Sequence, residues 1–536
     1  MKRELLVTDF LDRAREYYND EEAVVATTGE RYTYGELGDR ADRVSTALAE
    51  RGIGKGDRVA VLDPNTHYHL ESAYGIMQLG AIHTPLNYRL TSNDFEYILN
   101  DARVDAIIAD YEYAPKIEAV RDEVPTGTFI SNDAAKTEGD WEDFDEIIAD
   151  TDPDYERPAM DEDEVITINY TSGTTGDPKG VMRTHRTETL HAYLITIHQE
   201  IRDDDTYLWT LPMFHVNGWG HIYAITGIGA KHVCTRGIDA EAIFETVVAE
   251  DVSYFCAAPT VLNMLIDHYE SHGPETTGTN DVRVATAGSA PPEATIRTVE
   301  DEFGWYLKHV YGATETGPLI TTSDARRLLG DGEERFSLKK RQGIGYLGTE
   351  IAVVDEDGED VARDDASIGE IVVRGNQVME GYWEKQDATE EAFNDRREGW
   401  YHTGDLAVVD EHGMVSIQDR KKDIIISGGE NISSIELEDT LFDHEKVSDV
   451  AVIPAPSDEW GETPKAFIIP ATGNPDEPGV TEEEIREFTR EHMAGYKAVS
   501  HVEFVDELPT TATGKVQKYE LREQEWDDED RMVGQG

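Results

Sequence analysis

A segment rich in glycine and hydroxyl side chains offers the clearest chemistry in this sequence. Residues 170–180 read Tyr-Thr-Ser-Gly-Thr-Thr-Gly-Asp-Pro-Lys-Gly. Glycines let backbone N–H groups curl around an anion, hydroxyl groups donate further hydrogen bonds, and Lys179 supplies a positive charge. The preceding residues, 164–169, alternate between polar and apolar types as a buried strand does. The sequence therefore predicts a loop that holds the phosphates of a nucleotide triphosphate.

This loop differs from the common nucleotide-binding P-loop, which follows the pattern G-x-x-x-x-G-K-[ST]. Gly173 and Gly176 lie too close together for that pattern, and Lys179 does not follow a glycine. The machinery of kinases and GTPases is therefore not expected. The same residue types are common in surface turns, so the composition alone leaves an ordinary turn open.

Further segments combine glycine with polar or aromatic side chains. They occupy residues 211–220, 287–291, 311–318, 400–406, 419–432 and 509–516. Together with residues 170–180, and in this order, they resemble the motifs of the adenylate-forming superfamily, which includes acyl-CoA synthetases, luciferases and peptide-synthetase adenylation domains. The resemblance extends from about residue 30 to residue 522. It implies that a carboxylate attacks ATP to give acyl-AMP and pyrophosphate, and that the thiol of CoA then forms a thioester.

The resemblance also assigns residues to the nucleotide. Those implied to bind ATP or AMP are Thr171, Ser172, Gly173, Thr174, Thr175, Gly176, Lys179, Gly288, Ser289, Ala290, Tyr311, Gly312, Thr314, Asp405 and Arg420. Tyr311 can stack on adenine, and the carboxylate of Asp405 can accept hydrogen bonds from two ribose hydroxyls. Glu315 and Thr171 are the implied ligands of Mg²⁺, which prefers oxygen ligands and bridges phosphates.

Catalysis is implied for Lys515, His215 and Glu315. The reacting carboxylate and the α-phosphate are both anions, and a cation between them stabilises the transition state more than the ground state. Lys515 ends a Pro-Thr-Thr-Ala-Thr-Gly-Lys loop and suits that role. His215 stands where amino-acid-activating relatives usually carry an aspartate, which argues against an amino acid substrate. The residues implied to line the acyl pocket follow it: Val216, Trp219 and Gly220.

The C-terminal part is implied to rotate between the two half-reactions. Lys422 takes the hinge position, and Gly428 and Gly429 would let the pantetheine arm of CoA pass close to the backbone. The character of the sequence changes near residue 420. We therefore expect an N-terminal AMP-binding domain at 1–420 and a C-terminal domain with the catalytic lysine loop at 421–536.

The elements that must position these segments alternate between helix and strand. Thr33 and Glu36 form a capping-box pattern, and apolar residues at helical spacing follow until Gly52. Strands are predicted at 58–62, 81–84, 104–109, 252–257 and 282–285, and in the C-terminal part at 424–426, 450–453 and 466–469. Such alternation indicates layered α/β structure. The predicted fold is a large N-terminal multi-layer α/β domain with a small mobile α+β C-terminal domain.

The chain is strongly acidic, with 111 acidic and 48 basic residues and a net charge of −63. At low salt this field would repel anionic ATP and CoA and strain the fold, whereas at roughly 1 M salt the screening length is only about 3 Å. The charge predicts a cytoplasmic protein of a halophilic organism and argues against nucleic acid as a partner. No apolar run approaches the ~20 residues that span a membrane. Cys234 and Cys256 form no metal-binding pair.

Within the superfamily, the C-terminal segments are most similar to acyl-CoA synthetases that act on short- or medium-chain fatty acids. An aryl-CoA ligase and a nucleotide-binding protein without ligase activity stay open as alternatives, and so does assembly as a homodimer. Residues 343–348 satisfy G-x-G-x-x-G. A dinucleotide site is nevertheless not expected there, because that motif needs a strand before it and a helix after it.

Overall fold

A computed structural model of the 536-residue chain describes residues 3–153, 155–171, 178–273, 277, 281–330, 332–427, 430–457, 460–510 and 516–526. These residues form two compact units. The first comprises residues 3–171, 178–350 and 373–394, and the second comprises residues 351–372 and 395–526. The predicted boundary after residue 420 falls within the second unit and stays a prediction.

The first unit contains two sheets. In spatial order, the eight-stranded sheet consists of β19 (Gly381–Tyr382), β9 (Lys179–Thr184), β8 (Val165–Thr171), β4 (Ile82–Pro85), β3 (Arg58–Leu62), β5 (Ala106–Ala109), β6 (Thr128–Ser131) and β7 (Glu142–Asp143). Strands β8, β4, β3, β5, β6 and β7 pair in parallel, whereas β9 returns antiparallel to β8. The chain reversal between β8 and β9 therefore falls at the residues of the predicted phosphate loop.

In spatial order, the nine-stranded sheet consists of β16 (Ile344–Gly345), β15 (Leu319–Thr322), β14 (Tyr306–Gly312), β13 (Arg283–Thr286), β12 (Tyr254–Ala257), β10 (Thr206–Leu208), β11 (Lys231–Val233), β1 (Glu22–Val25) and β2 (Arg31–Thr33). From β1 to β14 its neighbours are parallel, and β15 and β16 add antiparallel pairs. Residues 343–348 contain β16, follow the helix at Arg335–Lys340 and lead into the strand at Thr349–Val354, so the motif has no strand before it and no helix after it, as expected.

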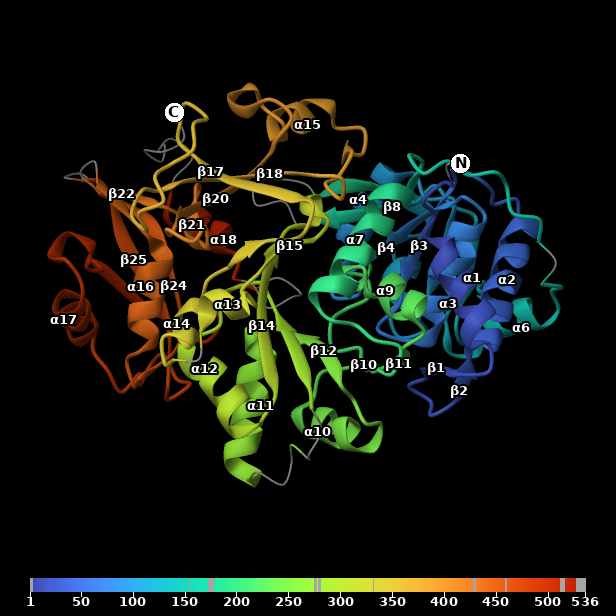
Figure 1. Ribbon diagram of the computed structural model, residues 1–536, viewed down its shortest axis with the longest axis horizontal. Coiled ribbons are helices and arrows are strands. Elements are labelled where there is room, and N and C mark those ends of the chain that lie inside the picture. The colour runs from blue at the N-terminus through green and yellow to red at the C-terminus, as the bar shows by residue number, and fades with distance from the viewer. Residues whose placement is uncertain are drawn as a thin grey trace. The chain divides into compact units, whose positions relative to one another are not determined.

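The helices of the first unit are α1 (Thr8–Tyr18), α2 (Tyr34–Glu50), α3 (His67–Gln78), α4 (Ser92–Ala102), α5 (Ala114–Glu118), α6 (Phe144–Ala149), α7 (His185–His198), α8 (Val216–Trp219), α9 (His221–Ile228), α10 (Ala240–Ala249), α11 (Pro259–His272), α12 (Glu293–Arg297), α13 (Arg326–Leu329), α14 (Arg335–Lys340) and α15 (Gln386–Ala392). Helices α4 and α5 cover one face of the eight-stranded sheet, and α2 and α3 cover the other. The core shared by the two sheets contains side chains of α1, α3, α7 and α9. Helices α10, α11 and α12 cover the outer face of the nine-stranded sheet (Figure 1). This succession of layers confirms the predicted fold class.

Local sequence signals explain why α2 and β3 form. Thr33 caps α2: its hydroxyl accepts a hydrogen bond from the backbone N–H of Glu36, whose carboxylate accepts one from the N–H of Thr33. This reciprocal cap satisfies two of the four N–H groups that a helix leaves open at its start. The predicted strand at 58–62 coincides with β3, in which Val59 to Leu62 are buried. Buried parallel strands of this kind are apolar on both faces.

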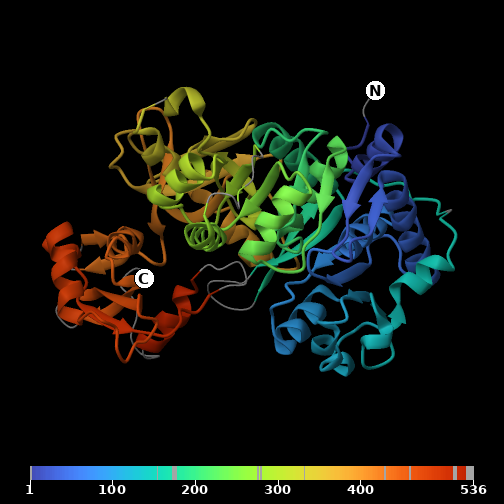
Figure 2. The same cartoon turned by 90° about the horizontal axis from the view of Figure 1, so that it is seen from below.

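The second unit also contains two sheets. Their strands are β17 (Thr349–Val354), β18 (Gly369–Gly375), β20 (Tyr401–Val409) and β21 (Val415–Arg420) in one, and β22 (Ile425–Ser427), β23 (Glu430–Ile432), β24 (Val447–Ser457), β25 (Gly461–Pro470) and β26 (His501–Phe504) in the other. The latter sheet lies in the C-terminal part of the chain, orange to red in Figure 2. Alternate residues of β24 pack with α16 (Ser434–Phe442) and α17 (Glu482–His492) on one face and with α18 (Lys518–Glu525) on the other.

The helices found among the described residues are all too short or too polar to cross a lipid bilayer.

Candidate active site

The ends of the predicted phosphate loop are fixed by the β8–β9 hairpin. Thr171 and Lys179 face each other as the last pair of the antiparallel register, and the Thr171 hydroxyl lies 3.5 Å from the Lys179 carbonyl oxygen. Ser172, Gly173, Thr174, Thr175 and Gly176 lie between them, outside the described residues. Because β8 runs parallel to β4, the loop starts at the carboxyl edge of the parallel strands, where open α/β sheets bind ligands.

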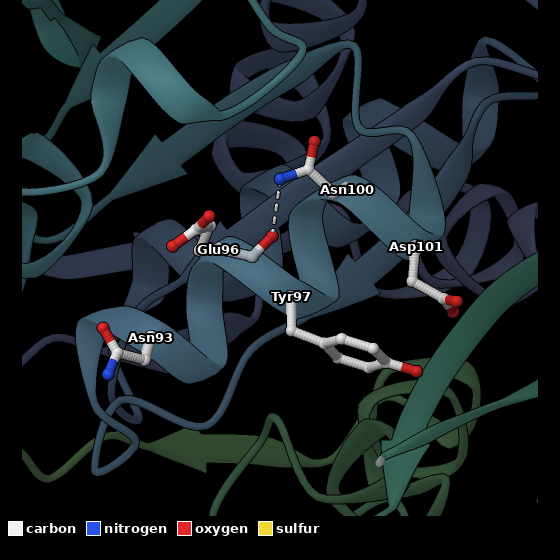
Figure 3. Close-up of a pocket in the computed structure, with 5 residues that line it drawn as sticks. All are labelled: Asn93, Glu96, Tyr97, Asn100 and Asp101. Atoms are coloured by element: carbon white, nitrogen blue, oxygen red, sulfur yellow. Dashed lines mark hydrogen bonds between the residues drawn. The ribbon is translucent and has the colours of Figure 1, made fainter.

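Helix α4 supports this hairpin from the outside. The Tyr97 hydroxyl donates a hydrogen bond to the carbonyl oxygen of Pro178 at 3.3 Å, and the Tyr170 hydroxyl donates one to Asp101 at 2.8 Å. Figure 3 shows that Tyr97 and Asp101 project from the same side of α4. With Asn93, Glu96 and Asn100, they also line a shallow surface hollow that contains none of the expected site residues. The helix thus positions the hairpin without itself forming the site.

One tyrosine connects the hairpin to the expected magnesium ligand. The Nζ of Lys179 lies 5.2 Å from the centre of the Tyr382 ring, and the Tyr382 hydroxyl donates a 2.9 Å hydrogen bond to Oε1 of Glu315. Tyr382 reaches this place because β19 pairs with β9 at Val181. The structure therefore brings Thr171, Lys179 and Glu315 close to one another. Tyr382 is not among the residues expected from the sequence, because its place at the site depends on the pairing of β19 with β9.

The second expected nucleotide segment, 311–318, begins at the end of β14 with Tyr311 and Gly312 and continues through Thr314 and Glu315. A Cβ at Gly312 would come within 1.6 Å of the Pro318 carbonyl oxygen, so only glycine fits there. The segment is held by backbone contacts, among them the N–H of Met379 donating to the Glu315 carbonyl oxygen at 2.8 Å. This fixes the backbone beside the side chain that is expected to bind the metal.

Arg183 is a buried anchor of the same segment. Its guanidinium donates hydrogen bonds to the carbonyl oxygens of Gly317 at 3.0 Å and Gln377 at 3.2 Å, and a longer contact of 3.5 Å reaches that of Thr314. It also forms an ion pair with the buried Glu188, one turn into α7. Burial raises the pKa of the Glu188 carboxyl, and the arginine beside it opposes that shift. Arg183, like Tyr382, is not among the residues expected from the sequence.

Gly288, Ser289 and Ala290 follow β13, the parallel neighbour of β14. Their segment and residues 311–312 therefore leave the same edge of the nine-stranded sheet. Gly288 has a φ of +103° and open space where a Cβ would project. A left-handed backbone with nothing above it permits close approach of a flat ligand to the chain.

The expected acyl segment forms a left-handed turn. Val216, Asn217 and Trp219 have φ values of 49°, 54° and 53°, and the glycines at 218 and 220 share the positive sign. Residues other than glycine rarely adopt this conformation, and such strain is concentrated at functional sites. Val216 and Trp219 are buried, and Trp219 belongs to the core between the sheets. His215 precedes the turn, and burial lowers its pKa to about 4, so its ring is neutral at neutral pH.

The remaining described site residues lie in the second unit. Asp405 of β20 and Arg420 of β21 face each other in the antiparallel register, with 3.3 Å between Oδ1 of the aspartate and Nε of the arginine. The expected hinge residue Lys422 is exposed in the turn that follows. Gly428, Gly429 and Lys515 lie outside the described residues. Asp405 and Arg420 thus form a matched carboxylate–guanidinium pair, the chemistry expected for a ribose and its phosphate.

The fold and these segments define an adenylate-forming enzyme. The family model described as "AMP-binding enzyme" matches residues 10–383, and the model described as "AMP-binding enzyme C-terminal domain" matches residues 436–515. The chain belongs to the AMP-binding enzyme family, and within it to the AMP-forming acid–CoA ligases.

Similar proteins that align over nearly the whole chain support this assignment. The chain is 37% identical to 4-hydroxybutyrate–CoA ligase 2 of Metallosphaera sedula, with 96% of this chain and 93% of the relative covered. It is 35% identical to a peroxisomal butyrate–CoA ligase of Arabidopsis thaliana, with coverage of 96% and 92%. The crystal structure of an anthranilate–CoA ligase in complex with anthranoyl-AMP superimposes with a TM-score of 0.85 and 26% identity, covering 98% of each chain.

Proposed function

We propose that this ligase activates short- or medium-chain fatty acids. In the first half-reaction, a carboxylate oxygen bonds to the α-phosphorus of ATP, and pyrophosphate leaves. In the second, the sulfur of CoA bonds to the acyl carbon, and AMP leaves. The observation that carries the proposal is the junction of Lys179, Tyr382 and Glu315 beside the hairpin, because it joins a phosphate-binding cation to a metal-binding carboxylate. The two relatives named for short acids support the choice of substrate.

Mg²⁺ fits this site as a companion of the nucleotide. Glu315 offers a carboxylate with one oxygen held by Tyr382, and Thr171 offers a hydroxyl at the hairpin end. Among the residues that the structure describes, no three acidic, histidine or cysteine side chains gather into a metal site. The phosphates of ATP would therefore supply most of the oxygen ligands of Mg²⁺, which is commonly bound by one or two protein side chains together with substrate phosphates. When bound, the ion would neutralise charge on the phosphates of ATP.

The other roles follow from the chemistry of each side chain. Lys179 would neutralise a phosphate, Tyr311 would stack on adenine, and Asp405 would accept hydrogen bonds from the ribose. Arg420 would orient the ribose and phosphate. In this proposal the chain after residue 420 acts as a mobile C-terminal domain, and its hinge is Lys422. Rotation of this domain brings Lys515 to the substrates in the first half-reaction and residues 428–429 in the second.

The proposal is tested by mixing the protein with a carboxylic acid and Mg-ATP. A burst of pyrophosphate rather than phosphate, followed by thioester formation when CoA is added, is the expected result. Phosphate release without pyrophosphate would overturn the proposal. An acid series from butyrate to octanoate, together with benzoate, then separates a fatty acid preference from an aryl preference.

We expect Trp219→Ala to shift the preferred acid toward longer or bulkier chains. The indole fills the volume of several methylene groups, and each additional methylene that fits contributes about 0.8 kcal/mol, close to a fourfold preference. The measurement is kcat/KM across the acid series, with the KM for ATP as the internal control. An unchanged chain-length profile would mean that Trp219 only packs in the core.

The acidic composition supports a halophilic, cytoplasmic origin. We expect the melting temperature to rise as salt increases from roughly 0.1 to 1 M, because screening of a net charge of −63 reduces self-repulsion. Differential scanning calorimetry in KCl checks this, and activity should rise over the same range. A melting temperature that does not depend on salt would contradict the halophilic origin.

A further inference from the structure

One buried carboxylate of the second unit is surrounded by groups from three segments of the chain. Glu370 lies on β18 and is 5% exposed. Its Oε1 accepts a 3.1 Å hydrogen bond from the backbone N–H of Gly404. Its Oε2 accepts a hydrogen bond from the guanidinium of Arg396, and it lies 3.6 Å from Nζ of Lys421 and 3.5 Å from Nδ1 of His402. One oxygen therefore holds a backbone group, and the other is the partner of cationic side chains.

These surroundings keep Glu370 ionised. Burial alone would raise the pKa of its carboxyl, but hydrogen bonding with His402 and Arg396 and the charge of Lys421 outweigh burial, and the pKa lies at about 2. An ionised carboxylate only accepts hydrogen bonds, so an acceptor faces the Gly404 N–H throughout the neutral pH range. Hydrogen bonds to ionised groups are stronger than those between neutral groups. Glu370 is therefore a firm attachment point for the backbone of Gly404.

The attached backbone leads directly into the expected ribose ligand. Gly404 precedes Asp405 and has a φ of +73°, a conformation that favours glycine. The N–H of Asp405 itself donates to the hydroxyl of Thr403 at 3.1 Å, and this hydroxyl donates to the carbonyl oxygen of Ile371 at 2.8 Å. Residues 370 and 371 of β18 thus hold the two consecutive N–H groups that come before the Asp405 side chain.

The same carboxylate also reaches the neighbouring strand. The N–H of Lys421 donates to the Gly404 carbonyl oxygen at 2.9 Å, and its side chain pairs with Glu370. Lys421 directly follows Arg420, whose Nε lies 3.3 Å from Oδ1 of Asp405. Glu370 is thus bonded to a chain neighbour of each member of the carboxylate–guanidinium pair.

We propose that Glu370 is a positioning residue that orients Asp405 toward the ribose hydroxyls of ATP. A misplacement of about 1 Å at a reacting site can cost about 10²-fold in rate, so the Asp405 backbone must be held in place. The pairing of β20 with β21 is irregular between Leu406 and Ala407, directly after Asp405. The bonds from β18 therefore supply a restraint that the β20–β21 pairing alone does not give. The proposal rests on the ribose role proposed above for Asp405.

The test measures how strongly the full chain distinguishes ATP from 2′-deoxyATP and 3′-deoxyATP. Pyrophosphate release is followed with Mg²⁺, CoA and an acid that the protein activates. The discrimination ratio is kcat/KM for ATP divided by kcat/KM for each deoxynucleotide. A hydrogen bond to a charged group is strong enough for a ratio of about tenfold or more in the unaltered chain. Glu370→Ala should bring this ratio close to one, whereas a purely structural role would reduce the use of all three nucleotides equally.

Three further variants define the effect. Glu370→Gln keeps one acceptor oxygen, which can face only one of the two sides, so its ratio should be intermediate. Thr403→Val removes the second link to β18 and leaves no buried charge without a partner, so it should lower the ratio even if Glu370→Ala does not fold. Val372→Ala trims the same strand where it packs against Val354 and Trp400. This control should lower the melting temperature and leave the ratio unchanged.

Asp405→Ala separates the inference from the ribose role on which it rests. If Asp405→Ala abolishes the discrimination but Glu370→Ala and Thr403→Val retain it, Glu370 has no positioning role while Asp405 still binds the ribose. If the unaltered chain uses ATP and both deoxynucleotides equally, both assignments fail. An equal fall of the ratio in Val372→Ala and Glu370→Ala would show a general loss of stability and would also overturn the inference.

Discussion

Replacing Lys515 with alanine is expected to slow acyl-adenylate formation by about 10²–10³-fold. The attacking carboxylate and the α-phosphate repel each other as they approach, and the lysine cation is the group that offsets this repulsion in the transition state. Carboxylate-dependent ATP–pyrophosphate exchange measures the step directly. The KM values for ATP and acid should change far less than kcat, because the interaction is made mainly in the transition state.

The second half-reaction provides the control for this variant. With acyl-AMP prepared beforehand and CoA added, Lys515→Ala should form thioester at nearly the normal rate. Lys446→Ala removes a half-buried lysine of the same C-terminal part. Its Nζ lies 3.7 Å from Oε1 of Glu484, and its loss should leave both steps unaffected. Equal loss in both half-reactions would show that Lys515 is not specific to adenylation.

Replacing Arg183 with methionine is expected to lower the free energy of unfolding by about 3–5 kcal/mol. The substitution leaves the Glu188 carboxylate buried without its cation, and the carbonyl oxygens of Gly317 and Gln377 lose their donor. Urea unfolding at constant high salt measures the change. The nucleotide segment should also lose its position, so the KM for ATP should rise.

Two comparisons separate this effect from a general loss of charge. Arg490→Met breaks an exposed ion pair with Glu483 and should cost no more than about 1 kcal/mol. The double variant Arg183→Met/Glu188→Gln removes the unpaired charge and should recover part of the stability lost in the single variant. A single-variant loss as small as that of Arg490→Met would show that the buried pair contributes little.

The elements that the sequence predicts are those with strong local signals. The capping box at Thr33 and the apolar spacing that follows it identify α2, and a short run of branched residues identifies β3. The strands predicted at 104–109, 252–257 and 282–285 exist, but each begins one or two residues later. Strand ends depend on where the neighbouring strand stops pairing, and a single sequence does not carry that information.

The residues of the candidate site also fall into those that the sequence can locate and those that it cannot. Motifs that are continuous along the chain, such as residues 311–318, can be located from the order of their residues alone. Tyr382 and Arg183 cannot be located in this way. The role of Tyr382 depends on the register between β19 and β9, and that of Arg183 depends on contacts with segments far along the chain.

The left-handed turn also bears on how the protein ages. Asn217 precedes Gly218, and in an Asn-Gly sequence the glycine nitrogen readily attacks the side-chain amide, which converts asparagine to aspartate or isoaspartate. Here the Gly218 N–H donates a 2.8 Å hydrogen bond to the Met213 carbonyl oxygen, and Asn217 is shielded from water. The folded chain therefore protects a bond that is labile in the unfolded chain. Loss of ammonia at Asn217, followed by mass spectrometry, would thus record the time that a molecule has spent unfolded.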